Sequence, residues 1–371
     1  MKKILFLTNT PSPYRVDFFN TLGAMDGIDL TVAFLYRPAD HTEREKQWFR
    51  EEYDSFTPVF LDKKIALPKG QYFHPEIRAL LKKPYDEIVF CGYAHLSMMY
   101  GMRLLKRWNR PFSIEIDGGL VGKDNAVRRR IKRSCISSAS TWFSTGEATD
   151  EYLIHYGADK NRIIRYPFSS VKESEIADKD ALSAEFKTQM RDALGIKEPR
   201  VLITVGQFIH RKGFDLLLEA AKDLPSDLGI LIVGGKPTQE YLDIVERYHL
   251  QNVHFLDFMD KKTLWKYYSA ADLFVLPTRE DIWGLVVNEA MACGLPVVTT
   301  DRCVSGLEMV RNGESGMIVE AGSAESLKQG IRSVLDADLG LMGNNALSTA
   351  KKYTIEEMAL LHAKVFLGSG R

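Results

Sequence analysis

Two carboxylates flank the start of an expected helix in the segment Pro277–Val298, PTREDIWGLVVNEAMACGLPVV. The apolar run Leu273–Leu276 predicts a buried strand, and a glycine precedes the run Leu285–Cys293, which has helical apolar spacing. The unpaired N–H groups at such a helix start carry partial positive charge and suit a phosphate. Asp281 and Glu289 would repel a phosphate unless they accept hydrogen bonds from sugar and ribose hydroxyls. The segment therefore predicts a nucleotide-sugar site, with a surface turn and an ordinary amphipathic helix as the alternative.

A pair of cations, Arg211 and Lys212, stands in the segment Val201–Glu219, VLITVGQFIHRKGFDLLLE. Val201–Val205 has the length of a strand, and Gly206–Gly213 is an expected loop. A diphosphate leaving group gains negative charge as its bond to the sugar breaks, and two fixed cations can stabilise that charge without a metal ion. An isolated pair of this kind would more often lie in a solvated basic loop. Together with the first segment it predicts a diphosphate site.

The two segments resemble the signature of glycosyltransferase family 4, retaining enzymes with two Rossmann-like domains. That family has two glutamates eight positions apart, and here the second is Glu289 while the first position holds Asp281, with Glu280 beside it. The departure leaves open which of the two neighbouring carboxylates reaches the sugar. The resemblance implies that Glu289 holds the ribose, that Asp281 holds the transferred sugar, and that Arg211 and Lys212 hold the diphosphate.

The resemblance also implies further contacts with the donor and a preference for its base. Uridine is the expected base because it is frequent among relatives. No cofactor is expected, and no sequence feature demands a metal ion, because the two cations can replace it. The remaining expected donor contacts are Gly206, Gly234, Phe258, Trp283, Gly284 and Leu285.

Strands alternate with helices along the chain, which predicts an α/β fold with parallel sheets. By resemblance these form two Rossmann-like domains that face each other across a cleft, with domains 1–170 for the acceptor and 171–352 for the nucleotide sugar. A helix in 353–371, centred on Ile355–Leu367, is expected to cross back to the first domain. Ser169–Arg200 is polar and predicts a linker, although Asp180–Leu194 has helical character, and Glu43–Glu52 predicts a surface helix or a loop. The expected strands are Ile4–Thr8, Leu30–Tyr36, Glu87–Cys91, Phe112–Ile116, Thr141–Ser144, Arg162–Tyr166, Val201–Val205, Gly229–Val233, Val253–Leu256, Leu273–Leu276, Pro296–Thr299 and Met317–Val319.

Asp117 is the candidate base for the acceptor hydroxyl. It follows an expected strand, in Glu115-Ile116-Asp117-Gly118-Gly119, where the family often places a histidine. Orientation of the acceptor, or capping of the next turn, is the alternative role. Glu115 and Asp117 point to the same side of a regular strand, so at least one is expected to meet the cleft. Arg15, after a loop with two prolines, is expected either to reach an anionic acceptor or to be solvated.

Charge is unevenly distributed in a chain of zero formal net charge. Residues 64–133 carry 15 basic and 6 acidic side chains, and the densest part is Arg128–Arg133. Residues 103–133 therefore predict peripheral contact with anionic lipid or an anionic acceptor, with a solvated helix face as the alternative. No motif supports nucleic-acid binding. Four separated cysteines and the absence of a signal-peptide pattern predict a cytoplasmic protein. Its expected partners are a nucleotide sugar and a saccharide or lipid-linked acceptor.

The expected activity is sugar transfer in bacterial surface polysaccharide synthesis, again by resemblance. Nucleotide-sugar epimerases of the same fold and an inactive sugar- or lipid-binding relative are the alternatives. A glycoside hydrolase would not need the cation pair. A nicotinamide enzyme would need a glycine fingerprint that does not follow Ile4–Thr8.

Overall fold

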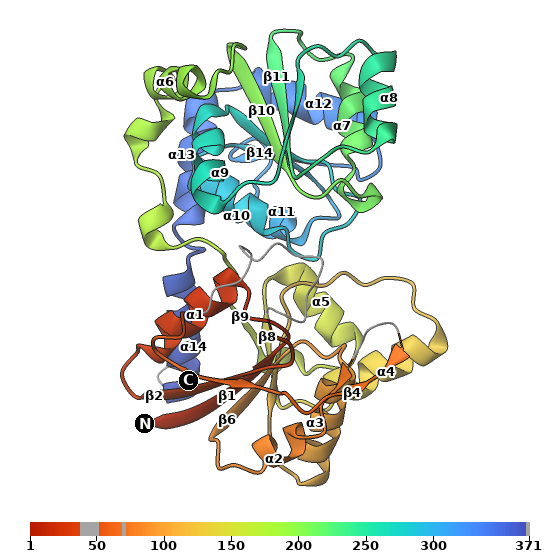
Figure 1. Cartoon of the computed structure of the whole chain (residues 1–371), viewed down its shortest axis with the longest axis vertical. Coiled ribbons are helices and arrows are strands. Elements are labelled where there is room, and N and C mark those ends of the chain that lie inside the picture. Colours follow the sequence, from red (N-terminus) through yellow and green to blue (C-terminus); the bar gives the residue numbers. More distant parts are fainter. Residues whose placement is uncertain (38–51, 69–71, 369–371) are drawn as a thin grey trace. The chain divides into compact units, whose positions relative to one another are not determined.

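The computed structural model of the chain describes residues 1–37, 52–68 and 72–368, which form two compact units (Figure 1). Unit 1 contains Met1–Ser170 together with Thr354–Arg371, and unit 2 contains Val171–Tyr353. Each unit is built around one parallel sheet with helices on its faces. This confirms the α/β fold with two Rossmann-like halves, and it places the C-terminal helix in unit 1.

The sheet of unit 1 has the strand order β3-β2-β1-β6-β7-β8-β9, and a small antiparallel pair, β4 and β5, lies apart from it. Its strands are β1 (Lys2–Thr8), β2 (Ile28–Phe34), β3 (Thr57–Phe60), β4 (Ile65–Ala66), β5 (Tyr72–Phe73), β6 (Glu87–Cys91), β7 (Ser113–Glu115), β8 (Thr141–Ser144) and β9 (Ile163–Arg165). Its helices are α1 (Pro13–Gly23), α2 (Ile77–Leu81), α3 (Leu96–Arg107), α4 (Ala126–Ile136), α5 (Glu147–His155) and α14 (Ile355–Leu367).

Helices cover both faces of this sheet, which explains why the interior strand β1 is apolar from Ile4 to Leu7. Leu5 and Leu7 of β1 are buried in a core that includes residues of α2 and α3. Phe6 points to the other face, where its ring contacts Phe18 of α1 and Phe366 of α14. A parallel strand buried on both faces has no polar alternation, so the continuous apolar run predicted it correctly.

The sheet of unit 2 has the strand order β12-β11-β10-β13-β14-β15. Its strands are β10 (Arg200–Val205), β11 (Leu228–Val233), β12 (Val253–Leu256), β13 (Leu273–Leu276), β14 (Val297–Thr300) and β15 (Gly316–Val319). Its helices are α6 (Ala184–Leu194), α7 (Phe214–Ala221), α8 (Gln239–Arg247), α9 (Lys261–Ala270), α10 (Leu285–Ala292), α11 (Val304–Met309), α12 (Ala324–Leu335) and α13 (Leu339–Ala350).

Strand β10 lies at the point where the order of the unit 2 sheet reverses. It pairs with β11 on one side, Arg200 opposite Leu228, and with β13 on the other, Leu202 opposite Leu273. The chain leaves β10 and β13 in opposite directions, and their following loops both lie at the carboxyl edge of the sheet. Such switch points are where open α/β sheets bind ligands.

The prediction that Ser169–Arg200 is a linker is wrong, because residues of this segment pack onto unit 2. Arg191 of α6 is 8% exposed and donates to the Ala270 carbonyl at 2.8 Å and to Asp272 at 2.6 Å. Buried ion pairs of this kind hold a polar helix in place without a large apolar face. Most of the expected element Glu43–Glu52 lies outside the described residues.

Candidate functional site

The loop after β10 brings Arg211 and Lys212 to the switch point of unit 2. The two cations lie in a 3-10 turn, His210–Lys212, which ends at Gly213 with a φ of 70°. A Cβ at this glycine would lie 2.0 Å from the carbonyl oxygen of Pro277, so no larger residue fits without a shift of the backbone. Gly213 therefore sets the cations against the neighbouring loop.

The loop after β13 is tied to the cation turn by hydrogen bonds. The guanidinium of Arg279 donates twice to the carboxylate of Asp215, at 2.8 and 2.5 Å. The backbone N–H of Arg279 and the hydroxyl of Thr278 both donate to the carbonyl of Arg211, at 2.8 and 2.9 Å. These hydrogen bonds hold the two loops together, and the two loops carry the charged groups of the site.

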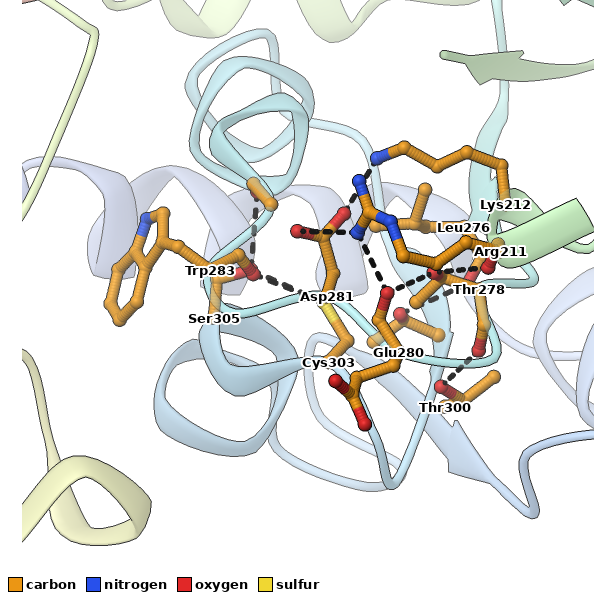
Figure 2. Close-up of polar contacts among 12 residues, drawn as sticks. Arg211, Lys212, Leu276, Thr278, Glu280, Asp281, Trp283, Thr300, Cys303 and Ser305 are labelled. Carbon is orange, nitrogen blue, oxygen red and sulfur yellow. Dashed lines mark hydrogen bonds and ion pairs between the residues drawn. The ribbon is translucent and has the colours of Figure 1, made fainter. Parts of the chain in front are cut away.

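Two hydroxyl groups hold the other side of the same loop (Figure 2). Thr300 donates to the carbonyl of Thr278 at 2.7 Å, and Ser305 donates to the carbonyl of Trp283 at 2.6 Å. Gly284 follows with a φ of 98°, and a Cβ there would press against the side chain of Ser305 at 3.2 Å. The turn from β13 into α10 is thus fixed in a conformation that favours glycine.

Asp281 is the carboxylate that faces the two cations, as Figure 2 shows. Lys212 Nζ lies 2.6 Å from its Oδ2 and Arg211 Nη1 lies 3.4 Å from its Oδ1. The carboxylate of Glu280 points away and pairs with Arg302 at 2.8 Å. Its backbone carbonyl accepts from Arg211 at 2.8 Å. Of the two carboxylates that the sequence left open, the geometry brings only Asp281 to the cations.

Helix α10 begins at Leu285, directly after its N-cap Gly284, and carries Glu289 one turn further along. The helix has no side-chain cap at its start. The hydroxyl of Tyr268 donates to Glu289 Oε2 at 3.3 Å, and burial, followed by the charge of Glu289, raises the pKa of Tyr268 well above its usual range. The side chain of Trp283 is 2% exposed and its indole N–H donates to Asn288 at 2.8 Å. The side chain of Trp283 therefore packs inside the unit.

The glycines expected beside the donor have a packing role. A Cβ at Gly234 would lie 1.7 Å from the carbonyl oxygen of Gly206, so the close backbone approach is between these two loops. Lys212 packs over Gly206, where a Cβ would contact its side chain at 3.3 Å. Phe258 follows β12 and is 46% exposed, so this side chain can contact a ligand.

The structure contradicts both predicted positions of Arg15 in unit 1. Arg15 is 3% exposed and pairs with both Glu115 and Asp117, so it neither lies in solvent nor extends toward an acceptor. The side chain of Asp117 is 32% exposed while that of Glu115 is fully buried. Only one of the two carboxylates, that of Asp117, reaches the surface of the unit.

The basic residues of 103–133 differ in what they contact. Arg110 donates to the carbonyls of Leu81 and Tyr85, at 2.5 and 2.7 Å, and so braces the fold. Lys132 pairs with Asp124 at 2.9 Å. Arg128–Arg130, in the first turns of α4, are exposed. Across the described ranges, no helix is both long and apolar enough to cross a membrane.

Several residues of the two sites were missed by sequence reasoning. The Arg279–Asp215 pair and Arg302 join positions that are far apart in the chain, and no local pattern marks such pairs. His362 in α14 lies among apolar residues and contacts Glu115 at 2.9 Å. Within 1–37, 52–68 and 72–368, no three or more His, Cys, Asp or Glu side chains gather in a group that could hold a metal ion.

Comparison with known proteins relates this geometry to a family. Residues 186–353 match the family model of glycosyl transferases group 1. D-inositol 3-phosphate glycosyltransferase of Rhodococcus opacus is 30% identical over 233 residues, which cover 58% of this chain and 50% of that protein. The chain thus spans about half the length of the curated relatives it matches.

Solved structures share the whole architecture at low identity. The structure of HepE from Anabaena in complex with UDP and glucose has a TM-score of 0.76 at 18% identity and covers 100% of both chains. WaaG, a glycosyltransferase involved in lipopolysaccharide biosynthesis, has a TM-score of 0.69 at 18% identity, covering 98% of this chain and 100% of its own. At such identities the likeness establishes the fold.

Proposed function

We propose that this chain, whose residues 186–353 match the family model of glycosyl transferases group 1, moves a sugar from a nucleoside diphosphate to a saccharide or lipid-linked acceptor with retention of configuration. The observation that carries the proposal is the cluster of Lys212, Arg211 and Asp281 at the switch point of the unit 2 sheet. It lies beside the uncapped start of α10. Cations and free N–H groups at one place suit a diphosphate.

Asp281 holds the cations in position before the donor arrives. An ammonium group has three N–H donors, so Lys212 can keep its contact with Asp281 and still donate to a phosphate oxygen. Arg211 is 47% exposed in its side chain, which leaves part of its guanidinium open to a ligand. The cation pair then stabilises the charge that grows on the leaving diphosphate, and we expect transfer to continue when divalent metal ions are chelated.

The carboxylates are assigned to hydroxyl groups. Glu289 accepts from the ribose and Asp281 from the transferred sugar, while Phe258 lies toward the base. In the reaction the acceptor hydroxyl gives its proton to Asp117, and its oxygen bonds to the anomeric carbon on the face that the diphosphate leaves. The diphosphate takes the bonding electron pair. The HepE structure holds UDP, which supports uridine as the base here.

Ligand screening followed by product analysis tests this function. A thermal-shift screen with UDP, GDP and ADP should show stabilisation by one of them, about 2.7 kcal/mol at a hundredfold excess over Kd. Wild type and Lys212→Ala are compared, with Lys351→Ala as the control, since Lys351 is an exposed lysine of unit 2 away from the cluster. Donor turnover with NMR of the product anomer then separates transfer, epimerisation and binding without chemistry. A protein that no nucleotide stabilises would contradict the proposal.

A role in surface polysaccharide synthesis, at the cytoplasmic face of a membrane, is the wider proposal. The name of WaaG supports it, and so does helix α4 of unit 1. Val127 and Ile131 of α4 are 69% and 41% exposed, four residues apart and therefore on one side of the helix, next to Arg128–Arg130. Exposed apolar side chains flanked by arginines suit the surface of anionic lipid.

Flotation with anionic liposomes tests the membrane contact. Replacing the arginines 128–130 by serine removes three cations worth about 1 kcal/mol each near such a surface, so the partition coefficient should fall about 100-fold. Neutral liposomes and high salt serve as controls. Equal flotation of the wild type and the variant would contradict the assignment.

A further inference from the structure

Helix α14 inserts a histidine into the interior of unit 1. His362 is fully buried, and its ring stacks on Phe143 with 4.6 Å between centroids and 14° between planes. Phe18 and Tyr166 meet the same ring edge-on, each at 5.0 Å. Phe6 and Phe366 complete the surroundings at 6.3 and 6.0 Å. Aromatic faces stabilise a cation placed against them.

The hydrogen bonds of His362 determine which of its nitrogens carry a proton. Nδ1 lies 2.8 Å from the carbonyl oxygen of Met358, which can only accept, so Nδ1 carries a hydrogen. Nε2 lies 2.9 Å from Glu115 Oε2. Burial alone would raise the pKa of Glu115, but the charge of Arg15, a permanent cation that pairs with the other oxygen of this carboxylate, lowers it, so the carboxylate is ionised. An ionised carboxylate also only accepts, and Nε2 must therefore donate.

Glu115 connects this histidine to the exposed part of the site. Its other oxygen pairs with Arg15, whose guanidinium also pairs with Asp117. A doubly protonated His362 and Arg15 would together offset the charges of Glu115 and Asp117, and burying charged groups requires such pairing. The chain of contacts runs from His362 on α14, through Glu115 on β7 and Arg15 on α1, to Asp117 after β7.

Asp117 is held by only one of its oxygens. Arg15 and the hydroxyl of Tyr166, the latter at 3.3 Å, both donate to Oδ1. Within the described residues, Oδ2 has no side-chain hydrogen bond or ion pair of this kind. Burial raises the pKa of Asp117, Arg15 opposes the rise and the charge of Glu115 adds to it. A carboxylate with one fixed and one open oxygen, and a raised pKa, suits a group that must accept a proton from a hydroxyl.

We propose that His362 is a doubly protonated imidazolium that acts, with Glu115, as a positioning residue for Asp117, so that the C-terminal helix supplies part of the acceptor side of the site. The inference rests on the proposed function, because Asp117 is assigned to the acceptor hydroxyl there. His362 does not touch the substrate and acts through Arg15. Its fixed charge sets both the place and the proton affinity of Asp117.

The charged and titratable groups around His362 determine how its loss is transmitted. In the described residues these include Glu115 on β7, Asp117 after it, Tyr14 and Arg15 on α1, Cys91 at the end of β6 and Tyr166 after β9. Burial raises the pKa of both Cys91 and Tyr166, and the Glu115 charge adds to it, so both stay neutral near neutral pH. Arg15 and His362 are then the only cations in this set that offset the two carboxylates.

The first test reads the protonation of His362 directly. Long-range proton–nitrogen NMR of the histidine rings, with the His362 signals assigned by their loss in His362→Phe, should show hydrogens on both ring nitrogens at neutral pH. A ring with only one protonated nitrogen would overturn the proposal. This measurement needs no substrate, so its result does not depend on the proposed reaction.

The second test separates positioning from simple packing. His362→Phe keeps an aromatic ring and should lower kcat about tenfold or more, as small misplacements of reacting groups do. Its nucleotide Kd should not change. His362→Gln keeps a donor toward Glu115 and should recover part of the loss. Phe366→Leu, a change in the same buried cluster, should lower stability and leave kcat near the wild-type value.

The pH profile gives the signature that packing alone would not produce. Removing a cation near the two carboxylates makes proton loss from Asp117 harder, so the acidic limb of kcat should move to higher pH in His362→Phe. An active wild type together with a variant unchanged in kcat and in this limb would overturn the inference alone. A wild type that transfers no sugar to any acceptor would overturn the proposed function and the inference with it.

Discussion

Replacing Lys212 by alanine removes the cation closest to Asp281. The ammonium group is 2.6 Å from the carboxylate, and the two side chains are 13% and 9% exposed. If Lys212 stabilises the leaving diphosphate, the loss of this one donor should lower kcat by about 10²- to 10³-fold, or about 2.7–4 kcal/mol. The control Lys351→Ala should retain wild-type turnover.

The same substitution has a separate effect on stability. In this variant the carboxylate of Asp281 loses its nearer cation but still has Arg211 at 3.4 Å, so its charge is not left without a partner. Loss of one charged hydrogen bond should cost about 1.5–3 kcal/mol in the free energy of unfolding. Adding Asp281→Asn to the Lys212→Ala variant removes the poorly paired carboxylate, so stability should partly return while turnover does not.

Denaturant melts and a nucleotide-release assay on the four proteins provide both quantities. Stability and turnover should move in opposite directions between the single and the double variant. Turnover of Lys212→Ala within about threefold of the wild type would refute the assigned role. A recovery of turnover in parallel with stability would show that Lys212 only supports the fold.

Three further predictions follow from the geometry of the described residues. Asp281→Asn should lower transfer at least tenfold more than Glu280→Gln in the same turnover assay, because only the first carboxylate faces the cations; equal losses would contradict the assignment. Gly213→Ala should lower the melting temperature and the affinity for the nucleotide, because its Cβ would lie 2.0 Å from the Pro277 carbonyl oxygen; unchanged nucleotide affinity by calorimetry would contradict it. Burial lowers the pKa of His95 to about 4, so the unfolded chain binds more protons between about pH 6.5 and 4. Stability should therefore decrease as the pH is lowered from about 6.5 to about 4. His95→Gln should make this decrease less steep in denaturant melts, and an unchanged slope would contradict the account.

The fold was readable from the sequence because its strands are buried on both faces. Leu273–Leu276 is apolar throughout and Val201–Val205 is apolar except for Thr204, and a parallel sheet requires mainly apolar residues in strands buried on both faces. Helix α14 was placed at Ile355–Leu367, between the N-cap Thr354 and a left-handed Gly368. Arg191 shows the limit, since its buried pair with Asp272 is a tertiary contact and composition alone suggested a linker.

The site residues could be predicted from the sequence where they lie close together in the chain. Arg211 and Lys212 lie in one turn, and Asp281 and Glu289 flank one helix start, so spacing was sufficient to predict them. The partners that fix these groups come from distant positions, and the pairing of Asp281 with Lys212 spans 69 residues. His362 is separated from Glu115 by 247 residues, and a single histidine on an apolar helix gives no sign of its partner.

The most direct measurement of the central claim is a crystal structure of the protein with a non-hydrolysable nucleoside-diphosphate sugar. The account predicts the diphosphate within hydrogen-bonding distance of Lys212 and the first amides of α10, with hydroxyl groups on Asp281 and Glu289. A diphosphate bound away from Lys212 and Arg211, with Asp281 still closed on both cations, would contradict it.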